Sequence, residues 1–158
     1  MAILGDGSYR DALGVLQKVL NFSKNKKIKL EEVEKITGSP KTTLVNEFLS
    51  AIVSKKIEEG IAVVQKAGAE NLDMKLYLKL IIQKFRMAII LRYAPKLEKE
   101  MDTNLSEIDL AFMKDLLKKD TEGILRSKAL AILLEAYSDI DQAFISELPL
   151  ELALIKIF

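Results

Sequence analysis

The sequence contains no cysteine and no histidine among its 158 residues. Without cysteine, the chain has no disulfide, no thiol nucleophile and no thiolate ligand for a metal. Without histidine, it lacks the commonest general acid or base and the commonest ligand of transition metals. Serine-type catalytic triads and most zinc sites are therefore excluded, and we expect no catalytic residue and no metal site in this chain.

Proline, glycine and aromatic residues are also scarce. The chain has 3 prolines, 7 glycines and no tryptophan, and aromatic residues make up 6% of it. So few helix breakers allow long helices, and the abundance of leucine, isoleucine, alanine and lysine favours them. Strand-like alternation and a fixed-period repeat are not evident. We therefore predict an all-α bundle of about seven or eight helices.

Neither sign of charge dominates, since 24 basic and 23 acidic residues give a net charge of +1. No overall field directs the chain to DNA or to an acidic membrane. The most apolar stretch, 76–93, contains four lysine or arginine residues, so it is too charged for a membrane span of about 20 residues. The first residues turn polar too soon for a secretory signal. We expect a cytoplasmic protein with no membrane partner.

Helix-start signals divide the chain into segments. Capping side chains, or a proline in the first turn, predict helices that begin near Ser8, Pro40, Asp73, Ser106, Thr121 and Pro149. Further helices are predicted over 30–36 and 57–67, each ended by a glycine, Gly38 and Gly68 respectively. The helix over 73–93 is apolar on nearly every side, which is typical of the central helix of a bundle.

The segment 7–17 combines a helix start with a cation. Ser8 and Asp11 can cap the first turn, and an apolar stripe follows at Leu13, Leu16 and Leu20. Arg10 lies in the first turn, where the positive end of the helix dipole disfavours a cation. Such a placement suggests an anionic partner, and arginine is suited to phosphate oxygens. The alternative is an ordinary capped helix with a solvated arginine.

Two other patterns imitate functional motifs. Residues 38–43 place Lys41 before Thr42 as in a phosphate-binding loop, but the second glycine is missing and Pro40 interrupts, so a helix cap is the better interpretation. The helix over 75–92 is rich in lysine and arginine. It could bind nucleic acid or an acidic partner, although long basic side chains extending from an apolar helix explain the same pattern.

The first of these segments resembles a known family. The run Gly7-Ser8-Tyr9-Arg10-Asp11-Ala12-Leu13 is similar to the sensor-2 helix of AAA+ clamp loaders, specifically the gamma/tau subunit of bacterial DNA polymerase III. The closing segment 147–154 is also similar to the last helix of this family. The break at 36–38 and the helix over 56–66 resemble the family more weakly. The archaeal and eukaryotic small loader subunits resemble it less, because they usually have Gly-Asp before the arginine.

The resemblance implies that the chain consists of parts of two domains with different roles. Residues 1–37 would be the C-terminal part of the lid domain, with Arg10 touching the terminal phosphates of the nucleotide, and residues 38–158 would be the helical collar. The phosphate-loop and acidic motifs of the family are absent from this sequence. We therefore expect no cofactor and no catalysis in this chain, and ATP with Mg²⁺ in the full-length parent.

The implied role of the collar is to hold the subunits of the loader in a ring. Its partners would be other gamma/tau subunits, delta and delta-prime, with DNA and the sliding clamp reached only through the assembly. The closing helix is more apolar than one core stripe requires. The predicted interface residues are Leu150, Leu152, Leu154, Ile155 and Ile157.

Two other classes of function remain open. A stand-alone helical adaptor could bind nucleic acid or an acidic partner through the basic helix over 75–92, and its binding would depend steeply on salt. An enzyme built on carboxylates is a weaker alternative, because the glutamate pairs in the sequence have no pocket context.

Overall fold

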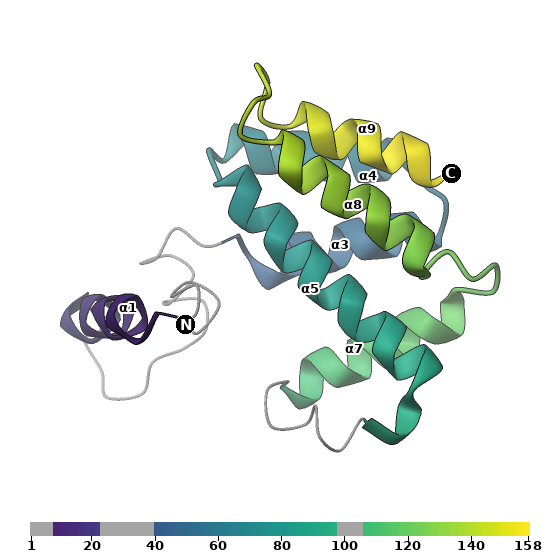
Figure 1. Cartoon of the computed structure of the whole chain (residues 1–158), viewed down its shortest axis with the longest axis horizontal. Helices are drawn as coiled ribbons and strands as arrows, with labels where there is room; N and C mark the ends of the chain where they lie inside the picture. Colours follow the sequence, from purple (N-terminus) through teal and green to yellow (C-terminus); the bar gives the residue numbers. More distant parts are fainter. Residues whose placement is uncertain (1–7, 23–39, 98–105) are drawn as a thin grey trace. The chain divides into compact units, whose positions relative to one another are not determined.

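The computed structural model describes residues 8–22, 40–97 and 106–158, and it divides the chain into two compact units. The first unit, Met1–Lys41, contains the helix α1 (Tyr9–Phe22). The second unit, Thr42–Phe158, contains six further α-helices and a short 3-10 helix in its described part (Figure 1). Those described ranges contain no strand, which confirms the predicted all-α class.

Five helices of the second unit form a closed cycle of neighbours. They are α3 (Thr42–Val53), α4 (Ile57–Ala69), α5 (Met74–Tyr93), α8 (Ser127–Asp139) and α9 (Leu148–Ile157). The order of contact is α3, α4, α9, α8, α5 and back to α3, as can be followed in Figure 1. The 3-10 helix (Pro95–Leu97) follows α5, and α7 (Glu107–Lys119) packs on α5 and α3.

The core of the second unit draws most on α3 and α5, which have seven buried residues each. The side chains of Tyr77, Leu78, Ile81, Phe85 and Ala88 on α5 are fully buried. The Tyr77 hydroxyl donates a hydrogen bond to the backbone oxygen of Leu44 on α3, at 3.0 Å. Its ring meets that of Phe48 edge to face, with 6.4 Å between centroids. The prediction of a central helix over 73–93 is consistent with this placement.

Two helices begin where the sequence predicts, each with a side-chain cap, and the cap at Ser106 is the predicted one. The Asp73 side chain accepts a hydrogen bond from the backbone N–H of Leu76 at 3.0 Å, which starts α5. The Ser106 hydroxyl oxygen accepts one from the N–H of Asp109 at 3.1 Å, which starts α7. Each bond satisfies a donor that the first turn of a helix leaves free.

Two predicted boundaries are wrong. Gly68 does not end its helix, because α4 continues to Ala69. Thr121 does not cap the following helix, since α8 begins only at Ser127. The predicted helix over 30–36 and its end at Gly38 lie outside the described residues.

Asp120 organises the turn where Thr121 was expected to act. Its carboxylate accepts hydrogen bonds from the backbone N–H groups of Ile124 and Leu125, both at 2.8 Å, and from Nη2 of Arg92 at 2.7 Å. Gly123 adopts φ = +67° within this turn, a conformation that costs glycine little. The result is a compact connection, anchored to α5 through Arg92, between α7 and α8.

Candidate apolar interface on the closing helix

The closing helix α9 separates into a buried and an exposed face. Leu150 and Leu154 have no exposed surface, and their side chains belong to the core. Leu152 and Ile155 are 49% and 54% exposed, and Ile157 is partly buried against the core. A side chain without exposed surface cannot meet a partner subunit. The predicted interface set therefore narrows to Leu152 and Ile155, with Ile157 at its edge.

The exposed face of α9 forms a continuous row, which we call the α9 stripe. It consists of Leu148, Leu152 and Ile155, spaced four and three residues apart, so that all three lie on one side of the helix. The loop before α9 adds Phe144, which is fully exposed, and Ile145, which is half exposed. Rows of large exposed aliphatic side chains are typical of protein interaction sites.

Reasoning from the sequence did not predict three residues of this exposed apolar surface, namely Phe144, Ile145 and Leu148. The available signal was a pair of large apolar residues inside a connection between two helices, at 144 and 145, where polar residues are usual. Their exposure extends the apolar surface beyond the helix itself.

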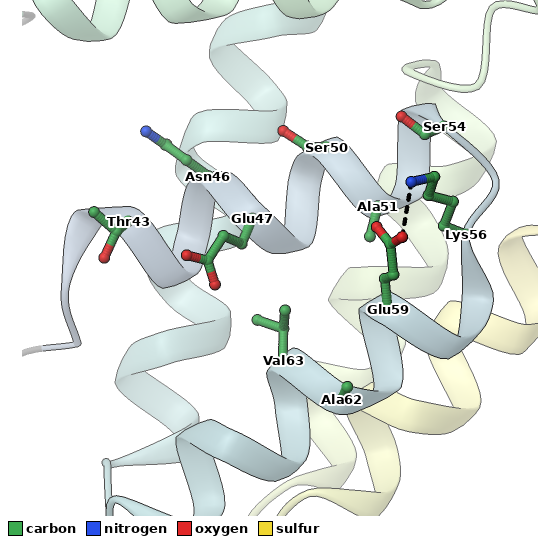
Figure 2. A pocket seen from close by; sticks show the side chains of 10 residues that line it. All are labelled: Thr43, Asn46, Glu47, Ser50, Ala51, Ser54, Lys56, Glu59, Ala62 and Val63. Atoms are coloured by element: carbon green, nitrogen blue, oxygen red, sulfur yellow. Dashed lines mark hydrogen bonds and ion pairs between the residues drawn. The ribbon is translucent and has the colours of Figure 1, made fainter.

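A groove of about 700 Å³ lies between α3 and α4, and Figure 2 shows it at close range. We call it the α3/α4 groove. Its lining consists of Thr43, Asn46, Glu47, Ser50, Ala51, Ser54, Lys56, Glu59, Ala62 and Val63. Alanine, serine, threonine and valine supply six of these ten side chains, and seven of the ten carry a polar group. Nothing in the sequence pattern indicated this groove.

Three of the five basic side chains of α5 pair with neighbouring acids. Lys84 Nζ lies 2.6 Å from Asp109 Oδ1, and Arg92 Nη2 lies 2.7 Å from Asp120 Oδ2. Lys75 pairs with Asp141, and this hydrogen bond raises the pKa of the Lys75 ammonium.

These pairs reduce the charge that α5 can offer to phosphate groups, because three of its five cations have a carboxylate partner. Of the other two, Arg86 is exposed. The geometry of α5 therefore gives little support to the alternative of a nucleic-acid adaptor acting through 75–92.

Arg10 lies in the first turn of α1 and is exposed, as a phosphate-contacting side chain must be. The backbone oxygen of Ser8 accepts a hydrogen bond from the N–H of Ala12 at 3.0 Å, so the helix begins where the sequence predicts. Leu13 and Leu20 of the predicted apolar stripe are more than half exposed, whereas Val19 is buried. The assignment of Arg10 to a nucleotide stays a prediction.

Within the described ranges, no group of three or more acidic side chains is placed to hold a metal ion. There, too, every buried polar side-chain atom has a hydrogen-bond partner. Burial raises the pKa of the Tyr77 phenol, but its hydroxyl is engaged with Leu44 inside the core. In the same part of the chain, no helix is long and apolar enough to cross a bilayer.

The chain is similar to a known protein family and to one of its characterised members. The family of DNA polymerase III subunits gamma and tau, domain III, matches residues 28–158. The DNA polymerase III subunit gamma/tau of Mycoplasma genitalium is 29% identical over 79 residues, which cover 50% of this chain and 13% of that protein. The chain thus spans only a small part of this relative's length. Because the family match covers most of the sequence, the chain belongs to the family of DNA polymerase III gamma and tau domain III.

Proposed function

We propose that the unit Thr42–Phe158 is the collar of a clamp-loader gamma/tau subunit, and that it joins neighbouring subunits through the α9 stripe. Membership of the domain III family supports the assignment to this subunit. The α9 stripe supports an association role, since Leu152 and Ile155 each leave about half of their surface in water. Burying such side chains at a contact stabilises it by roughly 25 cal/mol for each Å² removed from water.

By this proposal the chain is part of the multi-subunit clamp-loader assembly. The partners are other gamma/tau subunits together with delta and delta-prime, and DNA and the sliding clamp are reached through the assembly. The full-length parent binds ATP with Mg²⁺ and uses it to load the clamp. The present chain contributes association and no catalysis, and residues 1–37 are the end of the lid domain.

Leu152→Lys tests the association role. The substitution places a charge on the α9 stripe without touching the core, so the fold should persist while association with clamp-loader subunits weakens about tenfold or more. Leu97→Lys is the matched control, because Leu97 is similarly exposed (43%) and lies on the 3-10 helix, outside the α9 stripe. Light scattering and binding to immobilised partner subunits measure the effect. Unchanged assembly by a folded Leu152→Lys variant would contradict the proposal.

Arg10→Ala tests the proposed lid unit in the full-length parent. The side chain is exposed, so the variant should fold normally. Loss of one charge-assisted hydrogen bond to phosphate costs about 1.5–3 kcal/mol, and nucleotide-dependent clamp loading should fall accordingly. Lys18→Ala, on the same helix and also exposed, is the control. Normal loading by the Arg10 variant would remove the sensor-2 assignment.

A further inference from the structure

The α3/α4 groove has the shape of a receptor for bulky side chains. Ala62 is exposed and Val63 is partly buried, and both line the groove together with the buried Ala51. These side chains are short and leave space between the two helices. Helices pack when the side-chain ridges of one enter such a groove on another. The ridge that fits needs large aliphatic residues spaced three and four apart.

The rim of the groove has a defined pattern of charge. Lys56 Nζ lies 2.7 Å from Glu59 Oε1, and this pair is drawn as a dashed line in Figure 2. Glu47 extends from α3 toward the space that Val63 faces from α4 (Figure 2). Within the described part of the chain, the Glu47 carboxylate forms no ion pair. The groove therefore favours an apolar ridge that has a cation beside it.

The α9 stripe has both properties. Leu148, Leu152 and Ile155 form the ridge, and Lys156 follows directly on the same helix. Lys156 lies 3.1 Å from Glu135 within its own chain, but both side chains are more than half exposed. Exposed pairs of this kind contribute little, so Lys156 is able to exchange this carboxylate for another.

We propose, resting on the collar function proposed above, that the α9 stripe of one copy docks in the α3/α4 groove of a second copy. Lys156 then faces Glu47 of the neighbouring copy. The stripe and the groove are formed by different helices, so the contact is head to tail, and every copy has both surfaces. Association by this contact continues beyond a dimer. The rim carries two carboxylates, Glu47 and Glu59, against one cation, Lys56, which disfavours a nucleic acid as the occupant.

Disulfide cross-linking tests the contact directly, because the chain contains no cysteine of its own. A mixture of Leu152→Cys and Ala62→Cys chains should form the mixed disulfide under mild oxidation, since a disulfide requires Cα atoms within about 7 Å. A mixture of Leu152→Cys with Ala111→Cys is the control, because Ala111 is exposed on α7. The double variant Ala62→Cys/Leu152→Cys should give a ladder of linked species. A dimer linked through two copies of Leu152→Cys, or no link above the control, would overturn the proposal.

A second experiment blocks the α3/α4 groove with a bulky side chain instead of cross-linking it. Ala62→Arg fills the α3/α4 groove from an exposed position, and it should weaken self-association about tenfold or more while the unfolding midpoint stays unchanged. Ala111→Arg makes the same change on α7 and should leave association intact. Sedimentation equilibrium over a wide concentration range gives both values.

The outcomes separate this proposal from the collar function. If Leu152→Lys abolishes self-association and Ala62→Arg does not, the α9 stripe docks elsewhere and only the groove assignment fails. If the chain stays monomeric at high concentration yet binds delta or delta-prime through the α9 stripe, the second copy is the wrong occupant and the collar function stands. If no association of any kind occurs, both proposals fail.

Discussion

Asp120→Ala should destabilise the second unit by about 3–5 kcal/mol, which is typical of breaking a buried ion pair. The Asp120 side chain has no exposed surface and accepts three hydrogen bonds, one from Arg92 and two from the backbone N–H groups of Ile124 and Leu125. Alanine leaves both buried N–H groups without their acceptor, at about 1–3 kcal/mol each. It also leaves the Arg92 guanidinium, whose side chain is only 20% exposed, without its carboxylate. Domains of this size are stable by about 5–15 kcal/mol, so the loss is a large fraction of the total.

Urea unfolding of the chain, followed by circular dichroism, measures this loss as a lower midpoint with an unchanged slope. Asp115→Ala is the control, since Asp115 pairs with Lys119 at 2.7 Å on the exposed face of α7. Removal of an exposed pair within one helix should change the free energy of unfolding by about 0.5 kcal/mol or less. If Asp120→Ala costs less than about 1 kcal/mol, the turn is not held by this carboxylate and the reasoning is refuted.

Two glycines of α4 and one buried tyrosine give further predictions. Gly60→Ala should destabilise the unit by about 1–3 kcal/mol, because the new Cβ would lie 2.5 Å from Cδ2 of the buried Leu154. Gly68→Ala should stabilise it by up to about 1 kcal/mol, since the atoms nearest to the new Cβ are Oε1, Cδ and Cγ of the flexible Glu147 side chain, which can rotate away. Thermal unfolding of both variants checks these opposite signs. Burial raises the pKa of the Tyr77 phenol above its ordinary value of 10.0, so its stabilising contribution is complete below that pH and is lost as pH rises above it. Tyr77→Phe should remove this part of the alkaline loss, which urea unfolding at about pH 9 and about pH 11 would measure; an identical alkaline loss in the variant would show that Tyr77 does not cause it.

The sequence predicted helix starts wherever one side chain caps its own first turn. Asp73 and Ser106 do so through residues only three positions away. The prediction at Thr121 failed because the decisive partner is distant in the sequence. Asp120 takes the turn N–H groups while it is paired with Arg92, 28 residues away on α5. Local patterns contain no information about such a partner.

The sequence also could not predict which face of α9 is buried and which is exposed. The helix is apolar at nearly every position, so its periodicity cannot tell Leu150 and Leu154 from Leu152 and Ile155. Only the positions of α4 and α8 decide which side is buried. Gly60 on α4 is an example. Because Gly60 has no side chain, the Leu154 side chain of α9 can pack directly against α4. The α3/α4 groove escaped prediction for the same reason, since it exists only between two packed helices.

The cyclic order of the bundle has a consequence for how the chain folds. The contacts of α3 with α4 and of α8 with α9 join neighbours in the sequence, whereas the contact of α4 with α9 joins segments separated by most of the unit. Local pairs close at a small loss of chain entropy and form early, while distant pairs close late. We therefore expect two helical hairpins to form first and their docking through Gly60 and Leu154 to limit the rate. A substitution at this junction should then change the folding rate more than one at the turn within either hairpin.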